Sequence, residues 1–371
     1  MRSLVERLRQ TSKPDGERVQ YVPASVYLDQ AHFIKEREAL FLSRPVALIP
    51  TARLTSGQSV THDYYGVPLV VTRDAEGVAH VLVNVCQHRG TRLVETSAVQ
   101  SASRLVCPYH AWTYTLSGAL QGLPLPDSFP GLDKQRYRLN RLPVIEAGGL
   151  IWTRLDGKSI EPESVLGDIA DDFKTLGLAE AHVFQKTSHQ VTANWKLIMD
   201  AFLESYHVQR LHKNSIAPFF ADSITASDRV GDHFRSAVAR IGYREAKSDD
   251  SMDTLRQIIT FSFSLIPATV VVVSPDYINV MMIYPKNVDE TVVEDYMLIP
   301  EAPASQDDRL HWSESFKLLD GHVFGGEDFR AAELGQLGLS SGTIERVTLG
   351  AAEQGVADFH QTVLALIDEI D

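Results

Sequence analysis

The sequence predicts an α+β protein with two domains, a small all-β unit followed by a larger domain in which helices flank an antiparallel sheet. From about residue 45 to about residue 155, short apolar runs alternate with Gly, Asp and Ser clusters, which is typical of small β-domains. Beyond residue 156, helical periodicity returns and is followed by consecutive strand-like runs. Because no helix separates those runs, we expect the strands to pair antiparallel.

The length of the chain supports this division. At 371 residues it exceeds what one hydrophobic core usually organises. We expect an N-terminal helical lead-in at residues 1–40, a first domain at 41–156 and a second domain at 157–371.

The charge balance limits the partners that we expect. The chain has 35 basic and 48 acidic residues, a net charge of -13, which disfavours phosphate backbones and anionic membranes. Its start has no apolar core of the kind that a secretory signal requires, and no segment resembles a spanning helix. We therefore expect a soluble, cytoplasmic protein that binds neither nucleic acid nor a membrane.

Apolar runs and turn residues predict the individual elements in order. The lead-in contains a helical pattern at residues 26–42. Strand-like runs of the first domain occupy 45–50, 67–72, 80–85, 103–108 and 148–155. A connection rich in Pro and Gly covers 122–143. In the second domain we expect helices at 163–180, 194–211, 311–324 and 327–338, with strand-like runs at 261–273, 277–285 and 291–300.

The two cysteines of the chain each stand just before a histidine. Cys86 precedes His88 by two residues, and Cys107 precedes His110 by three. Zinc fingers usually pair Cys with Cys and His with His, whereas a Rieske 2Fe-2S cluster takes one Cys and one His from each of two loops. The mixed pairs therefore favour a Rieske cluster over a zinc site or two buried thiols.

A second candidate site contains His207 and His212. On an ideal helix, five residues turn about 500°, which leaves the two rings about 140° apart. The helix must therefore break or distort before His212 if both rings are to reach one ion. By spacing alone, a surface pair or a satisfied core pair remains an alternative.

Several segments together resemble the ring-hydroxylating oxygenase α-subunit family, which are Rieske-type non-heme iron enzymes. They are CQHRGTRL, CPYHAWTY and GGLIWTRLD in the first domain, and NWK followed by E-x-Y-H-x-x-x-x-H in the second. The resemblance implies an N-terminal all-β Rieske domain followed by an α+β catalytic domain. It also implies a 2Fe-2S cluster, a mononuclear Fe(II) and head-to-tail homotrimers.

The same resemblance implies roles for individual residues. The implied cluster ligands are Cys86, His88, Cys107 and His110. The implied iron ligands are His207, His212 and Asp328, the last in VFGGEDFRAAELGQLGL, with Glu327, Asp320 and Asp200 as competing carboxylates. Glu204 stands three residues before His207, where many relatives have an Asp at which electrons cross from the cluster. We expect Glu204 to keep that catalytic role.

The implied function is that of a terminal oxygenase, which activates O2 with electrons from a ferredoxin or flavin reductase. No GxGxxG or GxxxxGK[ST] motif is present, so NAD(P)H would act only through that separate protein. Alternating residues at 277–285 give one face suited to a mostly apolar pocket, which favours hydroxylation or oxidative demethylation of an aromatic or apolar molecule. The alternatives are oxidation of a quaternary ammonium compound, a non-catalytic Rieske electron carrier, or a protein with structural zinc.

Overall fold

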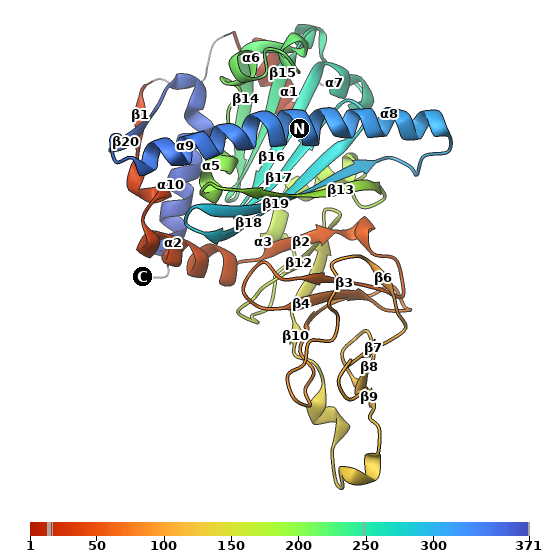
Figure 1. Cartoon of the computed structure of the whole chain (residues 1–371). Coiled ribbons are helices and arrows are strands. Elements are labelled where there is room, and N and C mark those ends of the chain that lie inside the picture. Colours follow the sequence, from red (N-terminus) through yellow and green to blue (C-terminus); the bar gives the residue numbers. More distant parts are fainter. Residues whose placement is uncertain (13–15, 17, 248, 370–371) are drawn as a thin grey trace. The chain divides into compact units, whose positions relative to one another are not determined.

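The computed structural model describes the chain from Met1 to Asp371 except residues 13–15, 17, 248 and 370–371. It divides into two units. Unit 1 comprises Met1–Phe41 and Leu166–Asp371, and unit 2 comprises Leu42–Val165. The α+β fold class is confirmed, with antiparallel sheets in both units (Figure 1).

Unit 2 is built from three small antiparallel sheets, as the short apolar runs predict. The largest has the order β10-β5-β4-β3-β6, and the others are β11-β12-β2 and β7-β8-β9. The strands are β2 (Val46–Pro50), β3 (Gln58–His62), β4 (Leu69–Arg73), β5 (Ala79–Val83), β6 (Gln100–Ser101), β7 (Leu105–Val106), β8 (Thr113–Tyr114), β9 (Leu120–Gly122), β10 (Arg141–Leu142), β11 (Val144–Ala147) and β12 (Leu150–Thr153). Between β9 and β10 the connection contains only the short 3-10 helices η4 (Pro126–Ser128) and η5 (Lys134–Tyr137).

Unit 1 is organised around one seven-stranded antiparallel sheet with the order β13-β19-β18-β17-β16-β15-β14. Its strands are β13 (His182–Val191), β14 (Phe220–Val230), β15 (His233–Arg240), β16 (Ile259–Leu265), β17 (Thr269–Val273), β18 (Ile278–Asn287) and β19 (Glu290–Ile299). The expected run at 261–273 is a hairpin of β16 and β17, because Pro267 has no N–H to continue a ladder. All residues of β16 are buried, so both faces of the central strands contribute to the core.

A single long helix crosses this sheet (Figure 1). It takes the place of the two helices expected at 311–324 and 327–338. It runs without interruption through α8 (Gln306–Phe316), the π-helical η8 (Lys317–Phe329) and α9 (Arg330–Ser340). Ser305 caps its start by accepting a hydrogen bond from the backbone of Asp308. A Cβ on Gly325 would lie 3.0 Å from the carbonyl oxygen of Asp320 and 3.1 Å from the His189 ring. Gly325 therefore serves close packing and does not end the helix.

The helix expected at 194–211 is interrupted. α5 (Trp195–Asp200) starts at Asn194, whose side chain accepts from the backbone of Lys196. A non-helical segment then leads to α6 (Val208–Leu211), a single turn with His207 at its N-cap and His212 at its C-cap. The expected helix is therefore broken before His207, and the single turn of α6 ends at His212, whose φ of -90° and ψ of 21° depart from helical values. The helix expected at 163–180 is likewise split into α3 (Glu163–Leu166) and α4 (Ile169–Thr175).

The N-terminal and C-terminal segments complete unit 1. They contain α1 (Arg2–Gln10), η1 (Ala24–Tyr27), α2 (Gln30–Glu36) with its π-helical extension η2 (Arg37–Leu42), and α10 (Gln354–Asp368). β1 (Gln20–Pro23) pairs with β20 (Arg346–Leu349), and α1 packs on β14 and β15. α7 (Met252–Ile258) directly precedes β16. Residues from both ends of the chain therefore enclose the central sheet.

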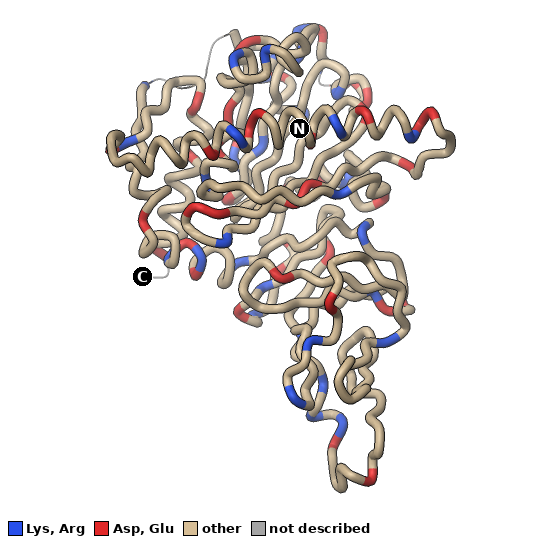
Figure 2. The backbone as a smooth tube through the Cα atoms, viewed as in Figure 1, with Lys and Arg blue, Asp and Glu red and all other residues tan. Residues whose placement is uncertain are grey.

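Charged residues of both signs are interspersed along the chain, so the net charge of -13 is not gathered in one segment (Figure 2). Among the residues that the structure describes, no helix is both long and apolar enough to cross a membrane.

Candidate metal centres

Cys86 and Cys107 begin two turns of matching geometry in unit 2. The backbone N–H of Cys86 donates to the carbonyl of Thr91, and that of Cys107 donates to the carbonyl of Trp112. In each turn the residue four positions after the Cys has a positive φ, 76° at Gly90 and 54° at Ala111. The repeated turn gives each Cys-His pair the same local setting. The spacing of each Cys-His pair in the sequence suggested two similar loops, and the matching hydrogen bonds from the two Cys N–H groups show that similarity.

The two turns bring buried thiol sulfurs and imidazole nitrogens, which are potential metal ligands, close together. Both thiols are free and only 2% exposed. The rings of His88 and His110 lie 4.7 Å apart, and Nδ1 of each is buried without a hydrogen-bond partner among the described residues. Tyr114 Oη lies 3.3 Å from Cys86 Sγ. Burial raises the pKa of the Cys86 thiol, and the nearby Cys107 thiol adds to this.

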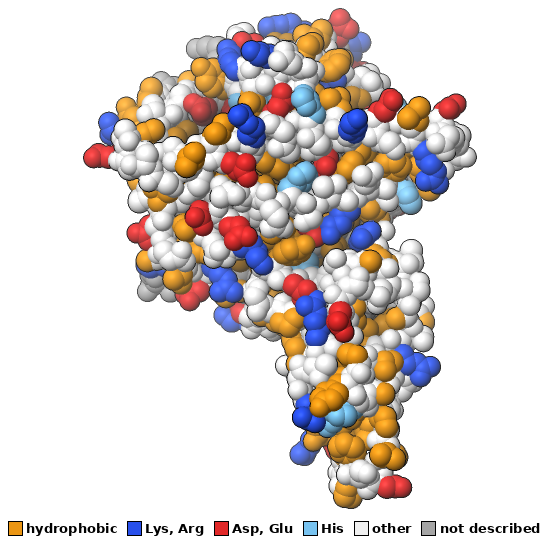
Figure 3. All heavy atoms as spheres, in the orientation of Figure 1, with side chains coloured by type: hydrophobic (Ala, Val, Ile, Leu, Met, Phe, Trp, Pro, Cys, Tyr) orange, Lys and Arg blue, Asp and Glu red, His pale blue; other side chains and the backbone are white. Residues whose placement is uncertain are grey.

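This donor set fits a 2Fe-2S cluster of the Rieske type. Two buried thiols and two unpartnered imidazole nitrogens are the ligands that such a cluster takes from two loops. The indole of Trp112 stacks on His88 at 4.8 Å and fixes the plane of that ring. Near these turns the apolar side chains Tyr109, Val106 and Leu125 are 55%, 45% and 76% exposed, and the guanidinium of Arg89 lies over the Tyr109 ring. Figure 3 shows hydrophobic side chains gathered over the same part of unit 2.

His207, His212 and Asp328 converge in unit 1. One ligand atom from each lies within 4.8 Å of the other two. Oδ1 of Asp328 is 3.2 Å from Nε2 of His212 and 3.6 Å from Nε2 of His207. Two ligands at right angles, each about 2.1 Å from one ion, are about 3 Å apart, so these separations suit adjacent coordination positions. Oδ1 of Asp328 is buried and makes no hydrogen bond within the described residues, as expected of an atom reserved for a metal.

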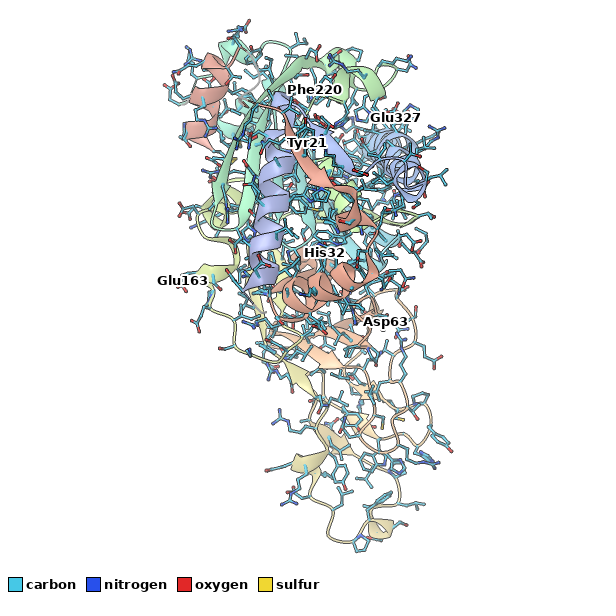
Figure 4. All side chains as sticks on the ribbon, turned by 90° about the vertical axis from the view of Figure 1, so that its left-hand side faces the viewer. Tyr21, His32, Asp63, Glu163, Phe220 and Glu327 are labelled. Atoms are coloured by element: carbon cyan, nitrogen blue, oxygen red, sulfur yellow. The ribbon has the colours of Figure 1, made fainter. Side chains whose placement is uncertain are left out.

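A carboxylate holds the other ring nitrogen of each histidine. Oε1 of Glu204 accepts from Nδ1 of His207, and the second oxygen of Glu204 accepts from the backbone N–H groups of Tyr206 and His207. Nδ1 of His212 donates to Oε2 of Glu327 at 2.8 Å. Such contacts fix the ring orientation and leave Nε2 free to bind a metal. Figure 4 labels Glu327 on the long helix, which is seen there almost end-on.

The contacts at this site shift the pKa values of His207, His212 and Glu327. Burial by itself lowers the pKa of His207, but the hydrogen bond to Glu204 and its charge outweigh burial and raise that pKa above its ordinary value. Burial likewise opposes protonation of His212, and the contacts with Asp328 and Glu327 raise its pKa overall. Burial alone raises the pKa of Glu327, yet Ser215 and His212 lower it overall. The site is therefore arranged to hold positive charge.

The carboxylates that competed with Asp328 all have other partners. Besides His212, Glu327 accepts from Ser215 Oγ at 2.7 Å. Asp320 pairs with His189 at 2.6 Å, and Asp200 accepts from Tyr27 at 2.8 Å. Sequence reasoning did not identify Glu327 and Ser215 as partners of His212. The only signal was the acidic pair at 327 and 328, which does not reveal which member faces the histidines.

The expected helical relation between Glu204 and His207 is wrong. Residues 201–207 are not helical, and Glu204 reaches His207 within a turn. The contact itself is present for a different reason: the carboxylate caps the backbone N–H groups that precede α6.

Two protein-family models match this chain, one in each of the two units. The family model described as "Ring hydroxylating alpha subunit (catalytic domain)" matches residues 178–369. The model described as "Rieske [2Fe-2S] domain" matches residues 44–140. The chain is similar to the carnitine monooxygenase oxygenase subunit of Acinetobacter pittii, with 27% identity over 97% of this chain and 98% of that protein.

Solved structures with the same fold include enzymes of two kinds. A quaternary ammonium Rieske monooxygenase in complex with an inhibitor superposes with a TM-score of 0.81 and 21% identity, over 99% of this chain and 98% of that one. Naphthalene 1,2-dioxygenase from Rhodococcus sp. superposes with a TM-score of 0.80 and 19% identity, over the same shares of the two chains.

Proposed function

Because this chain belongs to the ring-hydroxylating oxygenase alpha-subunit family of Rieske non-heme iron oxygenases, we propose ligands for its two metal centres and a class of substrate. The iron ligands are His207, His212 and Asp328. The cluster ligands are Cys86, His88, Cys107 and His110. The observation that carries this assignment is Oδ1 of Asp328, which makes no hydrogen bond within the described residues and lies beside two Nε2 atoms. The Nδ1 atoms of both rings already contact carboxylates.

When bound, the cluster supplies electrons one at a time and the ferrous iron activates O2. Glu204 and Glu327 orient the two imidazoles, and Asp328 completes a facial set of two histidines and one carboxylate. Through its contact with Nδ1 of His207, Glu204 is also the residue at which electrons enter the iron site from the cluster of a neighbouring subunit. This role requires the head-to-tail homotrimer that the family resemblance implies.

The electrons come from a separate ferredoxin or flavin reductase that uses NAD(P)H. The exposed apolar side chains Val106, Tyr109 and Leu125 near the cluster turns support docking of another protein there. We place the enzyme in the cytoplasm with its reductase. We also propose domain boundaries at residues 41–156 for the Rieske domain and 157–371 for the catalytic domain.

The proposed substrate is a small quaternary ammonium compound that is hydroxylated and cleaved. Support comes from the carnitine monooxygenase subunit, which is similar over nearly the whole chain. An aromatic pair also supports it, because Phe324 lies four residues before Asp328 on η8 and packs edge-on against Phe202 at 5.7 Å. Aromatic rings attract quaternary ammonium ions through their faces.

An aromatic substrate is the second candidate. The same two rings would stack on an aromatic molecule, and naphthalene 1,2-dioxygenase shares the fold. Of the two faces of β18, one carries Asn279, which donates to Asp295 on β19, and the other carries Ile278, Val280, Met282 and Tyr284.

The test supplies purified protein with a generic reductase, NADH and matched panels of trimethylammonium and aromatic compounds. We expect oxygen uptake and a hydroxylated or dealkylated product with the trimethylammonium panel. Turnover of only the aromatic panel would overturn the substrate proposal but not the ligands. Iron and sulfide analysis tests the ligands separately: Cys86→Ser loses the cluster spectrum, and Asp328→Ala loses mononuclear iron while the cluster spectrum remains.

A further inference from the structure

The segment 201–207 joins α5 to α6 without forming a helix, and it carries Glu204 and His207. The carboxylate of Glu204 accepts from the backbone N–H groups of Tyr206 and His207, which folds the segment only upon itself. The place of the segment within unit 1 therefore depends on contacts with other elements. Three such contacts are present, at Asp200, Leu203 and Ser205.

The first contact is made by Asp200, the last residue of α5, whose carboxylate meets two buried side chains. Tyr27 Oη, from η1, donates to Oδ2 of Asp200 at 2.8 Å. Nε2 of His360, from α10, lies 3.0 Å from Oδ1 of Asp200 and 2.8 Å from the Tyr27 oxygen. A carboxylate only accepts hydrogen bonds, which assigns the two donor hydrogens to Tyr27 and His360. Tyr27 is 0% and His360 4% exposed, so water does not compete for these bonds.

The second contact joins the backbone of the segment to the first turn of α10. A Cβ built on Gly355 would lie 2.3 Å from the carbonyl oxygen of Leu203. Side-chain carbons do not come that close to other atoms, so only glycine allows α10 to approach the chain at this point. Leu203 directly precedes Glu204. The helix α10 therefore holds the segment twice, through Gly355 and through His360.

The third contact lies on the other side of Glu204. Ser205 Oγ is 2.6 Å from Oγ1 of Thr225 on β14. Between these fixed neighbours, Glu204 borders a cavity of about 220 Å³ that Gly355 and Asp358 of α10 also line. Because the cavity leaves room beside Glu204, close packing on that side does not hold its carboxylate in place. Its position depends on the contacts of the residues around it.

We propose that Tyr27, His360 and Gly355 are positioning residues for the iron site. They hold the segment so that the carboxylate of Glu204 stays in contact with Nδ1 of His207. Protein N–H···O bonds span only about 2.7–3.2 Å, so a small shift of the segment toward the cavity breaks this contact. The imidazole then loses the partner that orients it toward the metal. This inference rests on the proposed iron ligands.

Hydrogen exchange of the full-length protein provides the first test, and it needs neither iron nor turnover. Tyr27→Phe and His360→Leu should each speed exchange of the amides at 206–207 by about fivefold, the effect of one lost hydrogen bond. Thr362→Val is the matched control, because Thr362 is buried on the same helix and its hydroxyl donates to the carbonyl of Asp358 within that helix. Exchange at 206–207 that is unchanged in both variants overturns the proposal.

Titration with Fe(II) provides the second test. His360→Leu should weaken iron binding by about 10-fold and leave the cluster spectrum unchanged. His360→Gln should restore most of the affinity, because its amide can still donate to Asp200. If His360 acts through Glu204, His360→Leu has little further effect in a Glu204→Ala background. An equal loss of affinity in both backgrounds would show that His360 supports only general stability, which rejects the positioning role.

Gly355→Ala keeps the test decisive even if the His360 variants fold poorly. The new methyl group presses on the Leu203 carbonyl and leaves the hydrogen bonds of Asp200 untouched. We expect faster exchange at 206–207 and weaker Fe(II) binding, with Gly338→Ala as the control in which a Cβ meets no atom within 4 Å. Wild-type values for both in Gly355→Ala contradict the proposal. If the wild-type protein binds no iron, the proposed ligands are wrong, whereas the exchange rates still decide the role of α10.

Discussion

At the scale of single residues, the proposed iron site contains two adjacent acids that make different contacts. Glu327 and Asp328 are neighbours in sequence, yet Glu327 accepts from Nδ1 of His212 and Ser215, while Asp328 turns toward the Nε2 atoms. Successive residues of the helical η8 point in different directions, so Glu327 contacts Nδ1 of His212 and Asp328 lies near Nε2 of the same ring. The longer Glu side chain is the one that reaches around the ring.

Glu327→Ala should weaken iron binding by about 10- to 100-fold, because His212 loses the partner that orients its ring. Titration of iron-free protein with Fe(II) measures this change. Glu314→Ala, an exposed position of the same long helix, is the control and should bind iron as wild type does. Equal affinity in Glu327→Ala would show that Ser215 and packing suffice to hold the ring.

Glu204→Gln keeps the size of the side chain and removes its charge. We expect both metals to remain, because neither is bound by Glu204, and we expect electron transfer from cluster to iron to slow strongly. Rapid mixing of fully reduced protein with O2 and substrate follows cluster oxidation directly. Oxidation as fast as in wild type would reduce Glu204 to a residue that orients His207.

At the scale of elements, the long helix shows how two glycines act inside a helix. The sequence GG at 325–326 suggested a helix end, but the π-helical turns continue through it. At Gly325 the space for a side chain is taken by the Asp320 carbonyl and the His189 ring. Close packing against β13 therefore fixes the helix that carries Asp320, Glu327 and Asp328.

Gly325→Ala should destabilise the protein by about 1–3 kcal/mol, the usual range for overpacking at a rigid contact. Gly338→Ala is the matched control, because it lies in α9 and a Cβ there meets no atom within 4 Å. That substitution should stabilise the helix by up to about 1 kcal/mol. Thermal unfolding of the two variants measures both effects, and a Gly325→Ala variant as stable as Gly338→Ala would refute the close contact.

At the scale of the whole molecule, the first 41 residues belong to unit 1 with residues 166–371. A fully buried ion pair joins them: Nζ of Lys196, on α5, lies 2.6 Å from Oε1 of Glu36, on α2. Nε1 of Trp195 donates to the other oxygen of Glu36. Burial opposes the charge on Glu36, yet Lys196 lowers the pKa of Glu36 overall. The N-terminal segment thus neutralises a buried charge on α5, the helix that precedes the proposed iron ligands.

Glu36→Gln leaves the charge of Lys196 buried without its partner and should cost about 3–5 kcal/mol of stability. Adding Lys196→Met should recover much of this loss, because two neutral side chains then pack together. Urea unfolding followed by tryptophan fluorescence measures both effects. Glu38→Gln, exposed in the same segment, is the control. A double variant no more stable than Glu36→Gln would contradict this account.

The sequence by itself determined the two-domain α+β class, the family and its two kinds of iron centre. It did so because the segments around each Cys-His pair and around His207 and His212 resemble those of an oxygenase family, and such local motifs are visible in a sequence. The tertiary structure decided what depends on distant segments. Glu327 stands 115 residues from His212, and His189 stands 131 residues from Asp320. The packing of the long helix against α6 and the sheet brings such residues together, and no local pattern encodes those contacts.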